Sequence, residues 1–202
     1  MDVGKWTENK IRYKIYLKSG IDVVVDDLLW IVHASVERSP QFVERSTISS
    51  NDVLDCLQRL NRVVISGLPG AGKTELAIQM AWNARDCRKY YKGIFWLNVA
   101  SSTSFQAGVQ DLARGMKLID ETQLVTVATK SEDIQEMVLQ ELNSSDHWLL
   151  VLDNLDEASL LKDFLPDQRD TRHVLITTPH RAMSSVLKLA RLISIHWNRR
   201  KR

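Results

Sequence analysis

The chain has 202 residues, of which 44% are hydrophobic and 26% charged, values typical of a folded soluble protein and unlike those of disordered or fibrous chains. The net charge is +2, but the basic residues 199–202 supply +4 of it, which leaves −2 for everything before them. A protein that binds DNA or RNA normally carries a basic face, so a nucleic-acid partner is not expected.

Targeting and metal signals are weak. Cys56 and Cys87 lie outside any CxxC pair and outside histidine ligand spacing, so a zinc site is not expected, and two thiols suit a reducing compartment. The N-terminus has no signal-peptide pattern, and the apolar stretch from Ile21 to Val36 is short and interrupted by Asp26 and Asp27. We therefore expect a cytoplasmic protein with no membrane contact.

In chain order, residues 1–39 form an N-terminal leader to which the sequence assigns no function. It predicts a short strand around 12–17 and then a helix from about Val24 to Glu37, which Ser39-Pro40 ends because a residue before proline is disfavoured in helical conformation. Residues 40–197 are predicted to form the main domain, and residues 198–202 a basic tail. That tail is expected to be a solvated chain end.

The main domain opens with an amphipathic helix followed by a strand. The residues from Ser49 to Asp52 form a capping box, and Val53, Leu54 and Leu57 follow at helical spacing. The β-branched stretch from Arg62 to Ser66 then predicts a buried strand that leads directly into a glycine-rich loop.

The same alternation of strands and helices continues to the end of the domain. Further strands are predicted at Ile94–Val99, Trp148–Leu152, Val174–Thr178 and Leu192–Ile195, with amphipathic helices after the loop, around Phe105–Met116 and around Ile134–Leu142. Near-continuous apolar strands separated by such helices predict an α/β fold of three layers, in which a five-stranded parallel sheet is flanked by helices.

The glycine-rich loop has the spacing G-x-x-x-x-G-K-T of a phosphate-binding P-loop. Its glycines allow successive backbone N–H groups to surround a phosphate, and the following helix directs the positive end of its dipole at the same place. Lys73 would reach the β- and γ-phosphates, and the Thr74 hydroxyl would bind Mg²⁺. The residues expected to contact ATP or ADP are Gly67, Leu68, Pro69, Gly70, Ala71, Gly72, Lys73, Thr74 and Glu75.

A P-loop requires an acidic residue for the magnesium ion at the end of another buried strand. Asp153 directly follows five apolar residues, where an ionised carboxylate is costly unless a cation or hydrogen bonds stabilise it. We predict that Thr74 and Asp153 bind Mg²⁺ and that Lys73 and Asp153 are the catalytic residues. The fold is therefore predicted to be that of a P-loop NTPase.

Together these motifs resemble the NB-ARC domain of the STAND class of P-loop NTPases, of the fungal and animal type often linked to tetratricopeptide-like repeats. The resemblance rests on the P-loop and on the segments Ile94–Val99, Leu149–Asp156 and Val174–Thr178, in that order. It implies an ATP/ADP-operated switch in cell-death or innate-immune-like signalling, with self-association or signalling proteins as partners. It also implies that Thr178, on a strand between the P-loop strand and the Asp153 strand, senses the γ-phosphate.

The chain departs from this family at three places. Glu44 replaces the glycine of the family's glycine-arginine motif, beside Arg45, the candidate contact near the adenine, and Pro179 stands where many members have an arginine. The sequence also stops just after its fifth predicted strand, so we expect an apparently truncated domain without the subdomains that clamp ADP in the family.

Asn154, next to Asp153, cannot accept a proton as a carboxylate could, so slow or absent ATP hydrolysis is expected. At most the chain is a slow NTPase. Two alternatives stay open: an active AAA+-like ATPase or P-loop kinase, and a truncated interaction partner of full-length relatives.

Overall fold

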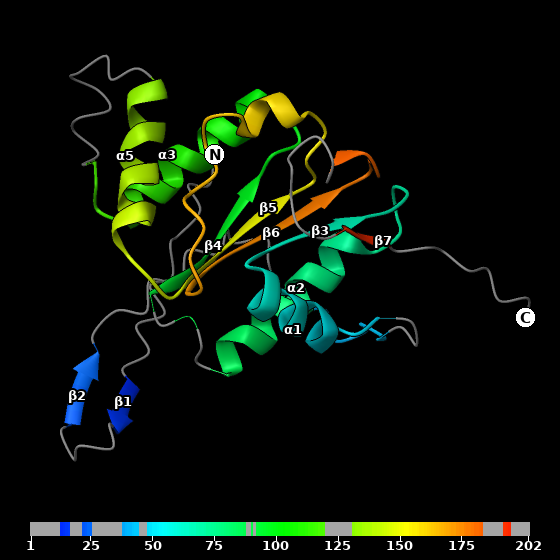
Figure 1. The fold of residues 1–202 in the computed structure, drawn as a ribbon, viewed down its shortest axis with the longest axis horizontal. Coiled ribbons are helices and arrows are strands. Elements are labelled where there is room, and N and C mark those ends of the chain that lie inside the picture. The colour runs from blue at the N-terminus through cyan, green and yellow to red at the C-terminus, as the bar shows by residue number, and fades with distance from the viewer. Residues whose placement is uncertain are drawn as a thin grey trace, which may run out of the picture.

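A five-stranded parallel sheet lies at the centre of the described part of the chain, in the strand order β4-β5-β6-β3-β7 (Figure 1). Its strands are β3 (Arg62–Ser66), β4 (Gly93–Asn98), β5 (Trp148–Asp153), β6 (Arg172–Thr178) and β7 (Leu192–Ser194). The computed structural model describes residues 13–16, 22–25, 38–44, 48–87, 90, 92–119, 131–183 and 192–194. Every residue of β5 and β6 is buried, as expected for central strands covered on both faces.

Helices cover both faces of the sheet, so the predicted three-layer fold is confirmed. The helices are α1 (Ser50–Leu60), α2 (Lys73–Asp86), α3 (Ser102–Gly115) and α5 (Ser131–Ser144). Successive strand residues point to opposite faces. Leu149 and Val151 therefore pack in the core shared with α1 and α2, while Leu150 and Leu152 pack in the core shared with α3 and α5.

The first helix begins where the sequence predicts. The Ser49 side chain accepts a hydrogen bond from the Asp52 N–H, and the Asp52 carboxylate accepts one from the Ser49 N–H at 2.8 Å, which is the predicted capping box. The helix ends at Asn61, whose φ of 61° is left-handed. This position fixes the point at which the chain enters β3.

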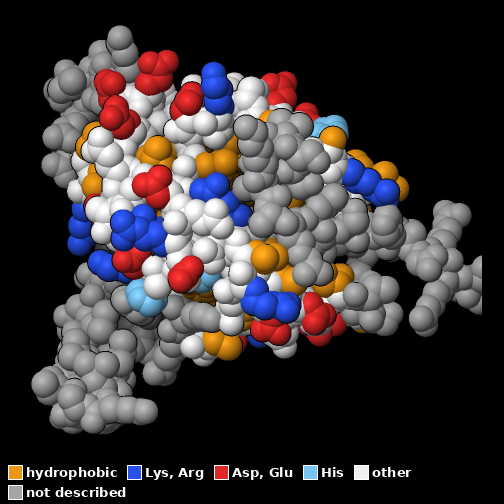
Figure 2. Space-filling model, viewed as in Figure 1, with side chains coloured by type: hydrophobic (Ala, Val, Ile, Leu, Met, Phe, Trp, Pro, Cys, Tyr) orange, Lys and Arg blue, Asp and Glu red, His pale blue; other side chains and the backbone are white. Residues whose placement is uncertain are grey.

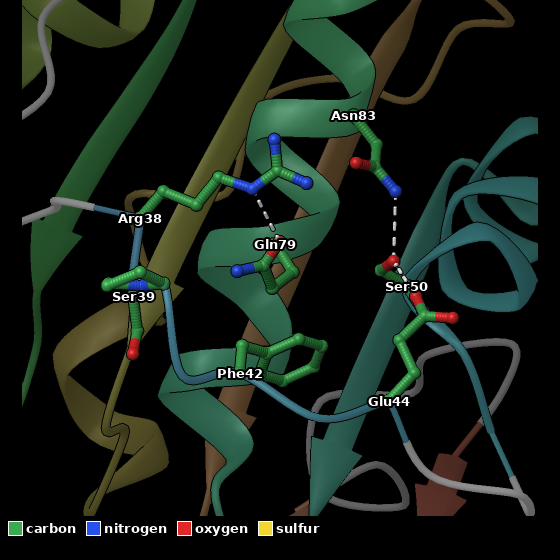
Figure 3. A pocket seen from close by; sticks show the side chains of 8 residues that line it. Arg38, Ser39, Phe42, Glu44, Ser50, Gln79 and Asn83 are labelled. Carbon is green, nitrogen blue, oxygen red and sulfur yellow. Dashed lines mark hydrogen bonds between the residues drawn. The ribbon is translucent and has the colours of Figure 1, made fainter.

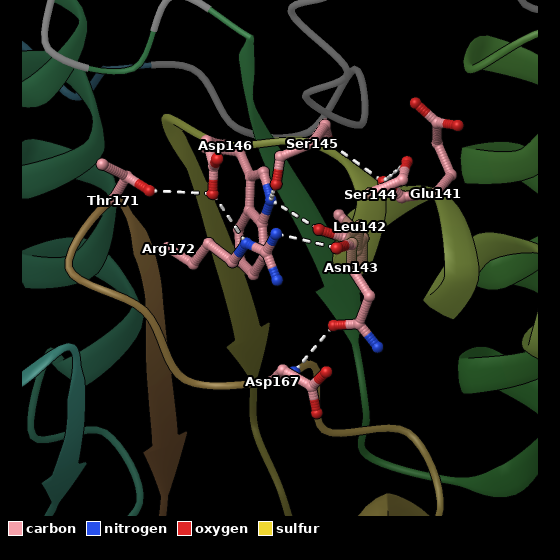
Figure 4. A network of polar contacts seen from close by, with 10 residues as sticks. Glu141, Leu142, Asn143, Ser144, Ser145, Asp146, Asp167, Thr171 and Arg172 are labelled. Carbon is pink, nitrogen blue, oxygen red and sulfur yellow. Dashed lines mark hydrogen bonds and ion pairs between the residues drawn. The ribbon is translucent and has the colours of Figure 1, made fainter.

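A network of polar contacts joins α5, β5 and β6 at the edge where these strands begin (Figure 4). The Arg172 side chain is 2% exposed; its Nε donates to Asp146 Oδ1 at 2.9 Å and its Nη2 to the Asn143 carbonyl at 2.7 Å. The fully buried Trp148 donates its indole N–H to the Leu142 carbonyl at 3.0 Å. The carbonyls at the end of α5 thus receive side-chain donors, which fixes this helix against the sheet.

The N-terminal region differs from the prediction. Tyr13–Tyr16 (β1) and Asp22–Val25 (β2) form an antiparallel pair, so Val24 and Val25 belong to a strand and not to the start of a helix. Three successive valines favour a strand because their branched side chains restrict χ1 in a helix. The rest of the predicted helix and the basic tail 198–202 lie outside the described residues.

Side chains of both charges are interspersed over the face of the molecule drawn in Figure 2, with no large area of one sign visible there. Within the described ranges, no helix is long and apolar enough to cross a bilayer.

Candidate functional site

The loop between β3 and α2 has a backbone that depends on its glycines. Gly70 and Gly72 have φ of 72° and 77°, in the left-handed region that favours glycine. A Cβ at Gly70 would meet nothing within 4 Å, so the conformation and not the available space calls for glycine there. Gly72 is the N-cap of α2 and provides no side-chain cap, which leaves this helix start suited to an anion.

Lys73, the first residue of α2, folds its side chain back over the loop. Its side chain is buried, and Nζ donates to the carbonyls of Gly67 at 2.9 Å and Leu68 at 3.0 Å. Burial lowers the pKa of the Lys73 ammonium, and the nearby Asp153 carboxylate partly opposes this. The positive charge is therefore held at the mouth of the loop, where phosphate oxygens can replace the two carbonyls.

Asp153 ends β5 and faces the start of α2. It is 8% exposed, and its carboxylate accepts hydrogen bonds from Thr74 Oγ1 at 2.9 Å and from Thr177 Oγ1 at 2.6 Å. Burial raises the pKa of Asp153, and the two hydroxyls and Lys73 oppose the shift. A hydroxyl and a carboxylate meeting at this distance are oxygen donors of the kind that Mg²⁺ prefers, so the residues present fit that ion.

Thr177 was not among the predicted site residues. Its hydroxyl donates to Asp153 and accepts from the Asn154 N–H at 2.8 Å, and its side chain is fully buried. Thr178, the predicted sensor, instead accepts from the His180 N–H at 3.0 Å, and its carbonyl accepts from the Gly67 N–H. Thr177 could have been identified from its spacing. It lies two residues after Leu175, and so on the face of β6 that packs against α1 and α2.

The turn after β5 is attached to the end of β6. Asn154 has a left-handed φ of 64°, and the Leu155 N–H donates to the Thr177 carbonyl at 2.7 Å. Asp156 Oδ1 lies 2.7 Å from His180 Nε2, and both side chains are more than half exposed. Asp156 thus pairs with the segment beyond Pro179, at the same edge of the sheet as the P-loop.

A cavity of about 470 Å³ lies between the segment 38–44, the start of α1 and one face of α2 (Figure 3). Arg38 Nε donates to Gln79 Oε1 at 3.0 Å, and Asn83 Nδ2 donates to Ser50 Oγ at 2.9 Å. Glu44 accepts from the Ser50 N–H at 3.2 Å. Glu44, where the resemblance predicts a glycine, therefore links the segment 38–44 to the first turn of α1, whose N-cap is Ser49.

The remaining predicted contacts lie around the loop or outside the described residues. Leu68 is 71% exposed on the P-loop, whereas Ala71 is buried. Glu75 lies on the first turn of α2, and none of the described residues donates to its buried Oε1. Arg45 is not among the described residues.

A parallel sheet of this order, with Lys73 and Thr74 opening the helix after β3 and Asp153 ending β5, defines the class of P-loop NTPase domains. Comparison with family models narrows the class. Residues 49–194 match the model of the NB-ARC domain, and the chain belongs to that family.

Two similar proteins are longer than this chain. A nucleotide-binding leucine-rich repeat (NLR)-like protein of Hyaloscypha variabilis is 30% identical over 102 residues, which are 50% of this chain and 10% of that protein. The crystal structure of a Signal Transduction ATPase with Numerous Domains (STAND) protein with a tetratricopeptide repeat sensor, from Pyrococcus horikoshii, has a TM-score of 0.50 at 20% identity. It covers 79% of this chain, which in turn covers 24% of that chain, and it supports the fold.

Proposed function

We propose that this domain binds ATP or ADP together with Mg²⁺ and acts as the nucleotide-operated module of a STAND-type signalling switch. The observation that carries the proposal is the meeting of Lys73, Thr74 and Asp153 at one end of α2. Lys73 supplies a buried positive charge, the helix start supplies backbone N–H groups, and Thr74 and Asp153 supply oxygen ligands. When bound, Mg²⁺ would neutralise negative charge on the phosphate oxygens.

We also propose that the cavity beside α2 receives the nucleoside. Gln79 lies about 9 Å further along the helix axis than Lys73, given a rise of ~1.5 Å per residue. The volume of about 470 Å³ falls in the range of small-ligand pockets, and the lining combines Phe42 with polar groups of Arg38, Glu44 and Gln79. Arg45, the predicted contact near the adenine, directly follows this segment in the sequence.

Slow hydrolysis is the third part of the proposal. A general base typically contributes about 10²- to 10⁴-fold to the rate of such a reaction. Asn154 offers no carboxylate, and Asp156 pairs with His180. The residues around Asp153 therefore favour retention of the nucleotide over its rapid turnover, as a switch requires.

The signalling role is supported by the family and by the description of the Hyaloscypha variabilis relative as NLR-like. The match covers only 10% of that relative, so the role and partners of this chain are part of our proposal. We propose that the protein acts in the cytoplasm, through self-association or through signalling proteins.

The proposal is tested by calorimetric titration of ATP, ADP and GTP, with and without Mg²⁺. We expect tighter binding of ATP and ADP than of GTP, and tighter binding of ATP with the metal than without it. Lys73→Ala should weaken ATP and ADP binding by about 10- to 100-fold, since hydrogen bonds to charged groups contribute about 1.5–3 kcal/mol each. Lys92→Ala serves as the matched control. It removes an exposed lysine just before β4, where the strands begin and away from the P-loop. Unchanged affinity in a folded Lys73→Ala protein would refute the P-loop assignment.

A further inference from the structure

Polar side chains lie side by side at the carboxyl ends of three neighbouring strands, β4, β5 and β6. Asn98 is the last residue of β4 and is the direct register partner of Asp153 on β5. Asp153 in turn contacts Thr177 on β6. The residues one position earlier on each strand, Leu97, Leu152 and Ile176, are apolar and buried.

These side chains lie on the face of the sheet covered by α2. Ile94 and Trp96 of β4, like Leu149 and Val151 of β5, belong to the core shared with α1 and α2. Alternation along each strand places Asn98 on this face together with Asp153. Because neighbouring strands lie about 4.8 Å apart, the register places the backbone of Asn98 directly beside that of Asp153, one of the proposed metal ligands.

The Asn98 side chain is oriented by its own backbone. Its Oδ1 accepts from the Ala100 N–H at 3.0 Å, which assigns the other end of the amide as the Nδ2 donor. Among the described residues, none accepts a hydrogen bond from that donor, and the residue is exposed. A fixed donor therefore points away from the turn, at the edge of the sheet where the P-loop also lies.

We propose that Asn98 Nδ2 donates to the terminal phosphate of a bound nucleoside triphosphate, and so makes Asn98 a specificity residue for ATP over ADP. This inference rests on the proposed nucleotide-binding function. The P-loop follows β3, the ligands for Mg²⁺ come from α2 and β5, and Asn98 lies one strand beyond them. In the proposed binding mode, a third phosphate would extend the ligand from the P-loop toward β5 and β4, whereas a diphosphate would not reach as far.

The variant Asn98→Asp separates this role from a purely structural one. Aspartate has the same shape and keeps an oxygen for the Ala100 N–H, but it replaces the donor with a negative charge. We expect it to weaken binding of a non-hydrolysable ATP analogue with Mg²⁺ by about tenfold or more, from the lost charge-assisted hydrogen bond and the added repulsion, and to change ADP binding by less than about twofold. Asn98→Ser, whose smaller side chain retains a hydroxyl near the turn, should give an intermediate loss for the analogue and none for ADP.

Asn143→Asp is the matched control, because Asn143 Oδ1 likewise accepts a backbone N–H, from Asp167 at 2.7 Å, and lies at the opposite edge of the sheet (Figure 4). It should leave both affinities unchanged. Circular dichroism of each variant confirms the fold. Equal losses for the analogue and for ADP, or no loss for either in both Asn98 variants, would overturn the inference. A parent protein that binds neither nucleotide would instead refute the proposed function.

Discussion

The substitution Asp153→Asn is expected to stabilise the nucleotide-free protein while it removes magnesium binding. Asp153 is buried, and burial raises its pKa above the ordinary value of an aspartate. The folded protein therefore disfavours the ionised carboxylate that the proposed magnesium site requires. Asparagine keeps the shape and an oxygen that can accept from Thr177, without the charge.

The size and the pH dependence of the effect follow from this cause. Single stabilising substitutions commonly add about 0.5–2 kcal/mol to the free energy of unfolding, and we expect a gain in this range. For a domain of this size, about 1 kcal/mol corresponds to a rise of ~2–4 °C in melting temperature. Because the native pKa is raised, the protonated form of Asp153 favours folding at low pH, and this contribution is lost as the pH rises through the native pKa. The gain from Asp153→Asn should therefore be full at pH 7 and shrink as the pH falls toward 4.

Two measurements decide the outcome. Urea unfolding of nucleotide-free parent and variant across this pH range gives the difference in free energy of unfolding, and titration of ATP with and without Mg²⁺ gives the metal dependence. A variant that is less stable than the parent at pH 7 would show that Lys73, Thr74 and Thr177 stabilise the carboxylate by more than its burial costs. A variant that retains the full metal dependence would remove Asp153 from the magnesium site.

Two further substitutions test the neighbouring residues. Asn154→Asp places a carboxylate beside Asp153 and should raise the rate of single-turnover ATP hydrolysis by up to about 10²-fold, through general-base catalysis. A fast parent protein with no gain in the variant would favour an active ATPase over a switch. Thr177→Val removes the hydroxyl that orients Asp153 and leaves the Asn154 N–H unpaired, so it should lower stability by about 1–3 kcal/mol and reduce the Mg²⁺ dependence of ATP binding. Thr178→Val, at an equally buried neighbour, is its control for the metal, and a selective loss of ATP over ADP affinity there would support Thr178 as the γ-phosphate sensor.

The P-loop and the first helix could be predicted because their geometry depends on local sequence. Gly70 and Gly72 adopt left-handed φ angles that their residue type favours, and the capping box at Ser49 is complete within four residues. The predicted strand order, with β6 between β3 and β5, came from the family resemblance and is confirmed.

Thr177 and Asn98 could not be placed in the same way. Their role depends on the register between parallel strands, which is determined by how the connecting helices pack and not by any short stretch of sequence. The contact of Glu44 with the Ser50 N–H could not be predicted either, because the two residues are six apart and form no local capping motif. The predicted helix from Val24 was wrong at its start because consecutive β-branched valines favour a strand there.

The two ends of the parallel strands differ in what their residues contact. At the edge where the strands begin, Arg172 and Trp148 tie the end of α5 to the strands. At the other edge, Asn98, Asn154 and the residue after Thr178 lie at strand ends and turns, where side chains are more exposed. On the proposed function, replacements there would alter nucleotide preference or turnover without disturbing the contacts that hold α5 to the sheet. A small set of positions at the carboxyl ends of the strands would then tune the proposed switch, while the packing that supports the fold stays the same.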